Sequence, residues 1–257
     1  MSRADLPENC QYIIGDAVEE LRRFNEEAAA VFLDDAWARP QRAQQFGVDY
    51  DTHPFDKTQD KLPDYIDTSL TTTDVIDAAY NALAEGGWLI ADADDWLLPR
   101  LVNYLQKEWG DVAASYRGGG YRKVGGVTYV SSDGTPDRST AGMYFSTGGY
   151  PVVFAHKGET DRKTSASVRQ IADRQQEQYS WGSVKPISPY EQWIDGLLDS
   201  EELILVPCAG TAPAALAAEN VLENPHYVCV DIEEDAKEAF HRRRQNEVES
   251  FQQKRLE

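Results

Sequence analysis

Few cysteines, no long apolar run and a shortage of positive charge set the first limits on this 257-residue sequence. Its three cysteines, Cys10, Cys208 and Cys229, are odd in number and form no Cys-x-x-Cys pair. This usage argues against a disulfide framework or a zinc cluster and fits a reducing cytoplasm. No apolar run approaches the roughly 20 residues that a membrane helix requires, and the first residues lack the apolar core of a signal peptide. We therefore expect a cytoplasmic protein without a membrane span and without a bound metal.

Positive charge is scarce, because 25 basic residues oppose 44 acidic ones and leave a net charge of −19. Such an acidic composition, with little lysine beside arginine, predicts a halophilic protein from a haloarchaeon or a virus of such a host. Counterion release drives much of ordinary DNA binding and fades as salt rises, so a halophilic DNA enzyme cannot depend on a large positive surface. The segment from Ser115 to Lys185 differs, since it holds ten basic and six acidic residues. We expect a polyanion to bind there.

Strand-like and helix-like segments alternate along the chain, which is typical of an α/β fold with a mostly parallel sheet and helices on both faces. The strands are expected at residues 11–14, 29–33, 88–91, 150–155, 202–206 and 226–230. The helices are expected after Asp16, at 73–84, at 99–109, after Ser188, at 214–222 and from Glu234 onward. We interpret residues 1–257 as one domain, in which the segment 115–150 is a recognition insertion of hairpins and loops.

Capping residues predict where several helices begin and end. Asp16 begins a capping-box pattern at the start of a helix. Ser188 is expected to be an N-cap, with a proline in the first turn and Glu191 as the capping-box acid. Gly86 and the glycine after it are expected to end the preceding helix. The polar stretch 159–178 is expected to be exposed.

The last third of the chain has the order strand, glycine-containing turn, helix, strand and acidic residue. Gly210 follows the first of these strands, and Asp231 lies about 20 residues further on, at the end of the second. This layout is typical of a nucleoside-binding βαβ unit, in which the ligand approaches the turn and the acid accepts hydrogen bonds from ribose hydroxyls. An ordinary βαβ unit with a polar loop is the alternative.

A second candidate site is the sequence Asp34-Asp35-Ala36-Trp37, at the end of an apolar strand. Ligands of open α/β sheets sit at the carboxyl ends of strands. A carboxylate there can accept a hydrogen bond from the exocyclic amino group of a base, and an aromatic ring can stack on a flipped base. An acidic strand end with a structural tryptophan is the alternative that spacing alone leaves open.

Further segments complete a pattern that covers most of the chain. They are Tyr12-Ile-Ile-Gly-Asp16, Leu83 to Leu89, Pro151 to Gly158, Lys185-Pro186, Leu205 to Thr211, Tyr227 to Ile232 and Ala239 to Arg244. Together with Phe32 to Trp37, their order resembles that of the permuted class of DNA amino-methyltransferases, which act on N6 of adenine or N4 of cytosine. In that class the catalytic half precedes the cofactor-binding half.

The resemblance implies a Rossmann-like methyltransferase fold, S-adenosylmethionine as the cofactor, double-stranded DNA as the partner and a role in restriction-modification. It implies that Asp34, the Asp35 carbonyl and Trp37 hold the target base without a metal. It assigns these residues to the cofactor: Asp16, Lys185, Pro207, Ala209, Gly210, Thr211 and Asp231. We expect the basic, glycine-rich segment to contact DNA through Arg117, Tyr121, Arg122, Lys123 and Arg138, although a salt-exposed hairpin is the alternative. A homodimer is a candidate assembly.

The sequence departs from the family pattern in both motifs. Asp35 and Ala36 stand where the family has two prolines, Val206 replaces its acid, and Ala212 replaces its second glycine. A catalytically silent relative that retains cofactor or DNA binding therefore stays open, as does a methyltransferase that acts on RNA or a small molecule. A nicotinamide-dependent oxidoreductase is a weaker alternative, since it requires a fuller Gly-x-Gly-x-x-Gly than Gly210 and its neighbours provide.

Overall fold

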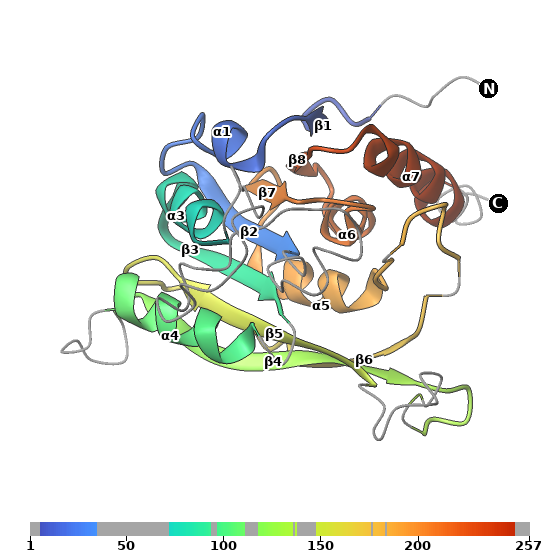
Figure 1. Cartoon of the computed structure of the whole chain (residues 1–257), viewed down its shortest axis with the longest axis horizontal. Helices are drawn as coiled ribbons and strands as arrows, with labels where there is room; N and C mark the ends of the chain where they lie inside the picture. The colour runs from blue at the N-terminus through green and yellow to red at the C-terminus, as the bar shows by residue number, and fades with distance from the viewer. Residues whose placement is uncertain are drawn as a thin grey trace, which may run out of the picture.

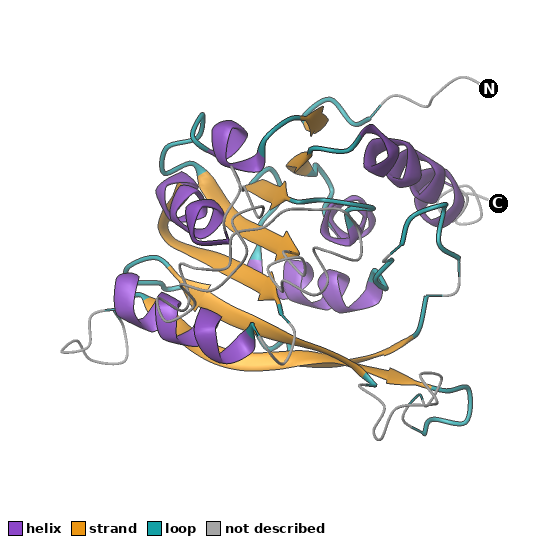
Figure 2. Cartoon of the chain, in the orientation of Figure 1, coloured by secondary structure: helices purple, strands orange, loops and turns teal. Residues whose placement is uncertain are grey.

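One sheet organises the chain, with helices on both of its faces (Figure 1, Figure 2). The structure is a computed structural model of the whole chain, and it describes residues 6–34, 72–93, 97–110, 118–135, 137, 148–175, 177–182 and 184–249. The predicted fold class, an α/β fold with a mostly parallel sheet and helices on both faces, is confirmed. In the described part of the chain, no helix is long and apolar enough to cross a membrane.

The strand order of the sheet is β1-β8-β7-β2-β3-β5-β4-β6. The strands are β1 (Cys10–Ile14), β2 (Ala28–Asp34), β3 (Leu83–Asp92), β4 (Gly120–Val130), β5 (Gly149–His156), β6 (Arg169–Asp173), β7 (Leu203–Pro207) and β8 (His226–Asp231). Only β5 is antiparallel to its neighbours β3 and β4, and the other neighbouring pairs of described strands are parallel. From β7 the chain continues to β8 on one side of the sheet, and from β2 it continues to β3 on the other side. A topological switch point therefore lies between the neighbouring strands β7 and β2.

Two groups of helices cover the two faces of the sheet (Figure 2). One face carries α1 (Ala17–Leu21), α3 (Thr72–Ala82) and α4 (Leu98–Glu108), and the other carries α5 (Ser188–Leu197), α6 (Pro213–Val221) and α7 (Glu234–Arg244), which continues as the π-helix η3 (Gln245–Glu249). In β2, Ala30 and Phe32 pack toward α5–α7, whereas Val31 and Leu33 pack toward α1, α3 and α4. Successive side chains of a strand point to opposite faces, so a strand covered on both faces requires the continuous apolar run seen here.

The helix end predicted at Gly86 is wrong. Helix α3 ends at Ala82, and β3 already begins at Leu83. Gly86 lies within the strand with φ +76°, and a Cβ on Gly87 would lie 2.9 Å from the carbonyl oxygen of Ala28. The register between β2 and β3 also shifts at Ala28. The two glycines therefore allow an irregular, close approach of two strands, which is a common role of glycine inside a sheet.

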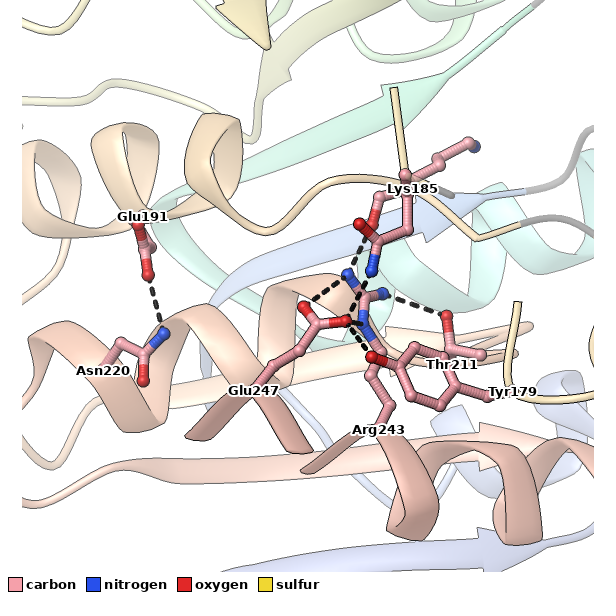
Figure 3. A network of polar contacts seen from close by, with 8 residues as sticks. Tyr179, Lys185, Glu191, Thr211, Asn220, Arg243 and Glu247 are labelled. Atoms are coloured by element: carbon pink, nitrogen blue, oxygen red, sulfur yellow. Dashed lines mark hydrogen bonds and ion pairs between the residues drawn. The ribbon is translucent and has the colours of Figure 1, made fainter. Parts of the chain in front are cut away.

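The cap predicted at Ser188 is also wrong. Ser188 is already helical, and Ile187 occupies the N-cap position of α5 without a side-chain cap hydrogen bond. Glu191 instead accepts a hydrogen bond from Asn220 of α6 (2.7 Å) and so joins two neighbouring helices (Figure 3). Asp16 does cap α1 as predicted, because its side chain accepts two backbone N–H groups at 2.8 and 3.1 Å.

The segment expected to form hairpins and loops and the segment expected to be polar and exposed both contribute a strand to the sheet. The segment 115–150 supplies β4, which pairs with β5 and β6. The polar stretch 159–178 supplies β6. Within this strand Ala172 is buried against the α5 face, whereas Arg169, Ile171 and Asp173 are exposed, as expected for this stretch. The role of residues 115–150 in reading DNA stays a prediction.

Candidate active site at the carboxyl edge of the sheet

The carboxyl ends of five parallel strands meet at one edge of the sheet. Asp34 ends β2, and its register partner Asp92 ends β3. Asp231 ends β8 beside Ile14 of β1, and Asp16 follows that strand. The loop after β7 lies between the two pairs of strands. The described members of the predicted catalytic and cofactor sets therefore share one edge, where ligands of open α/β sheets bind.

Lys185 joins the ends of β2 and β3. Its ammonium forms an ion pair with Asp34 Oδ1 (2.5 Å) and donates a hydrogen bond to Asp92 Oδ2 (2.7 Å). Lys185 and Asp92 are buried, whereas 30% of the Asp34 side chain is exposed. Burial alone lowers the pKa of the Lys185 ammonium, but the two carboxylates together outweigh burial and raise that pKa above its usual value. Lys185 therefore stays charged beside the predicted catalytic aspartate.

Asp92 is a site residue that the sequence analysis missed. Its Oδ2 also accepts a hydrogen bond from the hydroxyl of Tyr190 (2.6 Å). Its Oδ1 is buried and has no hydrogen-bond partner among the described residues. Burial, opposed by Lys185 and reinforced by Asp34, raises the pKa of Asp92 to about 6. The available signal was its position directly after a predicted strand, which is also the position of Asp34.

Tyrosine rings line the same corner of the sheet. The Lys185 ammonium lies 4.8 Å from the ring centroid of Tyr150, whose hydroxyl is 3.4 Å from that of Tyr190. The ring of Tyr129, near the end of β4, lies 5.9 Å from that of Tyr150. Burial raises the pKa of Tyr150 and of Tyr190, so both phenols stay protonated. Tyr150 reaches this edge only because β5 is antiparallel to β3, which no local sequence signal revealed.

The loop after β7 turns sharply through three residues with positive φ. They are Cys208 (φ 53°), Gly210 (φ 50°) and Ala212 (φ 45°). Ala212, which stands where the resemblance implies a glycine, adopts the left-handed conformation that glycine adopts without strain. The carbonyl of Gly210 accepts a hydrogen bond from the hydroxyl of Tyr12 (2.7 Å). The loop therefore turns through left-handed residues and is tied to β1 by Tyr12.

Asp231 closes this loop from the neighbouring strand. Its Oδ2 accepts the backbone N–H of Gly210 (2.7 Å), and its Oδ1 accepts that of Glu233 (3.0 Å). Burial raises the pKa of Asp231, and these backbone hydrogen bonds oppose that rise without cancelling it. Each carboxylate oxygen has a second lone pair, so Asp231 can still accept ligand hydroxyls. The structure thus brings Gly210 and Asp231 together, as the βαβ interpretation predicts.

Arg243 of α7 lies behind this loop and is completely buried. Its guanidinium donates hydrogen bonds to Thr211 Oγ1 (3.1 Å) and to the main-chain carbonyl of Lys185 (2.7 Å), and it pairs with Glu247 (3.2 Å) (Figure 3). Glu247 also accepts a hydrogen bond from the hydroxyl of Tyr179 (2.5 Å). Arg243 therefore connects the loop, the lysine of the site and the C-terminal helix.

The predicted DNA-contacting residues lie farther from Asp34. Tyr121, Arg122 and Lys123 stand near the start of β4, toward the opposite edge of the sheet. Arg122 Nε donates a hydrogen bond to His156 Nε2 (2.6 Å), and Lys123 is exposed. The other predicted residues, Asp35, Trp37, Arg117 and Arg138, lie outside the described residues. Within the described ranges, no group of three His, Cys, Asp or Glu side chains is placed to hold a metal ion.

Comparisons with known proteins define the fold. No protein-family model matches the chain, and no curated protein matches its sequence. PvuII DNA methyltransferase (cytosine-N4-specific) superposes with a TM-score of 0.62 at 13% identity, over 92% of this chain and 86% of that one. M1.HpyAVI in complex with SAM gives 0.60 at 12% identity, with coverage of 91% and 98%.

TTHA0409 from Thermus thermophilus, in complex with S-adenosyl-L-methionine, gives a TM-score of 0.60 at 16% identity, with coverage of 93% and 94%. These structures span nearly the whole of this chain and most of their own length. At such low identity the likeness defines the fold and leaves the activity to the site. The chain has the Rossmann-like fold of methyltransferases.

Proposed function

We propose that this protein is a DNA amino-methyltransferase that transfers a methyl group from S-adenosylmethionine to N6 of adenine or N4 of cytosine. One observation carries the proposal: the Asp34–Lys185–Asp92 cluster and the loop closed by Asp231 lie on neighbouring strands at the same edge of a methyltransferase fold. An acceptor for an amino group and a nucleoside-binding turn thus stand side by side. Cytoplasmic location and a role in restriction-modification stay predictions.

The residues after β7 and β8 fit the cofactor. Asp231 is buried, yet it retains lone pairs for the ribose hydroxyls, and Gly210 adopts the positive φ that the turn requires. Ala212 preserves the turn, so the loss of the family glycine does not remove the binding surface. Asp16 stands one residue beyond Gly15, whose N–H donates to the Asp231 carbonyl (2.9 Å), and so lies beside the end of β8. When bound, the cofactor supplies a methyl group on a positively charged sulfur.

The charged cluster suits work on an exocyclic amino group. Such a nitrogen is a poor nucleophile because its lone pair is conjugated with the ring. Asp34 accepts one amino hydrogen and directs the lone pair toward the methyl group, and Lys185 fixes the orientation of its carboxylate. Asp92 Oδ1 takes up the proton that leaves the nitrogen as the new N–C bond forms, since it is an unpartnered acceptor with a pKa of about 6.

Aromatic and basic groups supply the contacts to DNA. Tyr150 presents its ring next to the charged cluster and is a candidate wall for a flipped base, while stacking by Trp37 stays a prediction. Lys123 is exposed and can contact a phosphate. Arg122 donates a hydrogen bond to His156, so it attracts DNA only through its positive charge. The remaining, acidic part of the chain repels DNA. We therefore expect DNA binding to be strongest at a salt concentration that screens this repulsion.

The proposal is tested in two stages with the full chain in about molar potassium chloride. The first stage is titration calorimetry with S-adenosylmethionine, for which we expect micromolar binding that is lost in Asp231→Ala. The second stage is incubation of genomic DNA with the protein, followed by mass spectrometry of the nucleosides for N6-methyladenine and N4-methylcytosine. Asp34→Asn keeps the shape of the side chain, so it should retain cofactor binding and abolish methylation.

The outcomes separate the proposal from its rivals. Binding without methylation of any DNA would identify a catalytically silent relative. Methylation of RNA but not of DNA would move the substrate to the other nucleic acid. Absence of S-adenosylmethionine binding at every salt concentration would overturn the proposed methyltransferase activity, and only the assignment of the fold would stand.

A further inference from the structure

The outer edge of β6 has the features of a strand that pairs with another strand. β6 is the last strand of the sheet, and β4 is its only neighbour among the described strands. Arg169, Ile171 and Asp173 are exposed, and 70% of the Ile171 surface is accessible. An exposed edge strand with an apolar residue at its centre is a template for pairing, and proteins that do not use such an edge usually blunt it.

Backbone groups of the same three residues face away from β4. The carbonyl of Val168 accepts a hydrogen bond from the N–H of Gly126 on β4 (3.0 Å), so the peptide groups of residue 168 and of alternate residues after it point toward β4. The peptide groups of Arg169, Ile171 and Asp173 therefore point outward. In keeping with this direction, the N–H of Arg169 bonds to the hydroxyl of Ser167 (3.1 Å) instead of to β4.

The sequence of β6 is complementary to itself in the antiparallel direction. Its five residues read Arg-Gln-Ile-Ala-Asp, with opposite charges at the two ends and isoleucine at the centre. An antiparallel copy centred on Ile171 places Arg169 of each chain opposite Asp173 of the other. Opposite charges directly across an antiparallel pair are favourable, and like charges there are unfavourable.

We propose that two copies of this chain associate through β6, in antiparallel register centred on Ile171, to form one continuous sheet. A pair of this kind is isologous, since the same patch serves both partners around a twofold axis. That axis stands normal to the sheet, so the two carboxyl edges face opposite directions and each candidate site stays open. The assembly does not depend on methyl transfer, and its test stands apart from the test of the proposed function.

The net charge of −19 per chain opposes association at low salt. Above roughly 1 M salt the Debye length falls to about 3 Å, so repulsion between chains is screened while contacts in the interface are preserved. We therefore expect dimerisation to strengthen between about 0.15 and 2 M potassium chloride, opposite to the weakening that salt causes in a purely ionic interface.

Charge exchange across β6 tests the register. Sedimentation velocity of the full chain at high salt should show a dimer whose population both Arg169→Glu and Asp173→Arg shift toward monomer. The double variant restores opposite charges across the pair and should restore the dimer. Both positions are exposed, so loss of folding is not expected, and thermal melts check this. A wild-type protein that is monomeric at both salt concentrations would overturn the proposal, as would a dimer that both single variants leave intact.

Cysteine cross-linking tests the centre of the pair. Ile171→Cys places two cysteines directly opposite each other with Cα atoms about 5.5 Å apart, within the range of a disulfide. Arg169→Cys is the matched control, because its two copies would stand roughly 13 Å apart along the strands. Mild oxidation should yield a covalent dimer from Ile171→Cys and no more than the wild-type background from Arg169→Cys. Equal cross-linking of the two variants would overturn the register.

Discussion

The guanidinium of Arg243 donates a hydrogen bond to the main-chain carbonyl of Lys185, 58 residues earlier in the chain (2.7 Å). The same guanidinium bonds to the hydroxyl of Thr211 in the loop after β7 (3.1 Å). Lys185 in turn carries the ammonium that joins Asp34 to Asp92. The C-terminal helix thus holds both the cofactor loop and the charged cluster from behind, without facing the ligand itself.

Arg243→Lys should weaken S-adenosylmethionine binding at least tenfold, or about 1.4 kcal/mol. A lysine carries the charge but lacks the planar fork that reaches Thr211 and Lys185 together. The loop and Lys185 would then lose their common anchor. Titration calorimetry of the variant at high salt measures the effect.

Arg244→Lys is the matched control for Arg243→Lys. Arg244 is the next residue of α7, is also buried, and pairs with Glu219 (2.8 Å) on a helix that does not contribute to the charged cluster. Both variants should lower the melting temperature, but only Arg243→Lys should lose cofactor affinity. Equal losses of affinity in the two variants would show that the effect of Arg243 is merely structural.

Asp92→Asn should remove an ionisation from the pH profile of methyl transfer. The pKa of Asp92 is raised to about 6, so the carboxylate accepts a proton only above that pH. Turnover by the wild type should therefore rise as the pH passes through about 6 and then level off. The variant should be about 100-fold slower, the usual loss for a general base, and should show no such rise. A variant with the wild-type profile would exclude Asp92 as the proton acceptor.

The parts of this site that follow from the sequence are those that depend on strand ends. Asp34, Gly210 and Asp231 each follow an apolar strand, and parallel strands bring such positions to one edge wherever they fall in the sheet. The partners of Lys185 could not be predicted in this way. They depend on β2 and β3 being neighbours in register, which is a property of the sheet order.

Tyr150 and Arg243 illustrate the same limit. Tyr150 begins a strand, and only the antiparallel direction of β5 carries it to the edge where the other strands end. Arg243 lies in a highly charged helix, yet it is completely buried. Local periodicity does not reveal a buried charge whose partners are distant in sequence, because the pairing itself makes the burial tolerable.

Ala212→Gly should change the free energy of unfolding by no more than about 1 kcal/mol. Glycine removes the strain of a left-handed alanine, but it also loses a buried methyl group and gains entropy in the unfolded chain, so the effects nearly cancel. Ala212→Val should cost at least about 2 kcal/mol, since a β-branched residue is severely strained at φ 45°. Urea unfolding measures both. Tolerance of valine would contradict the left-handed conformation of residue 212.

His156 should make the stability of the protein fall as the solution is acidified. Its Nε2 accepts a hydrogen bond from Arg122 Nε (2.6 Å), and its Nδ1–H donates to the carbonyl of Gly158 (2.8 Å), so the ring is neutral in this arrangement. Burial, and then the charge of Arg122, lowers the pKa of His156 below its ordinary value of 6.5. As the pH falls through 6.5, the unfolded chain takes up this proton before the folded chain does. The contribution of His156 to stability is therefore complete above that pH and is lost progressively below it.

His156→Gln isolates the effect of this histidine from that of other titrating groups. The wild type should lose more of its melting temperature between about pH 7.5 and 5.5 than the variant, because glutamine has no proton to gain. His226→Gln, at the partly exposed start of β8, is the control and should follow the wild type. If His156→Gln declined as steeply as the wild type, the histidine would not be the group whose protonation loosens the β4–β5 pair.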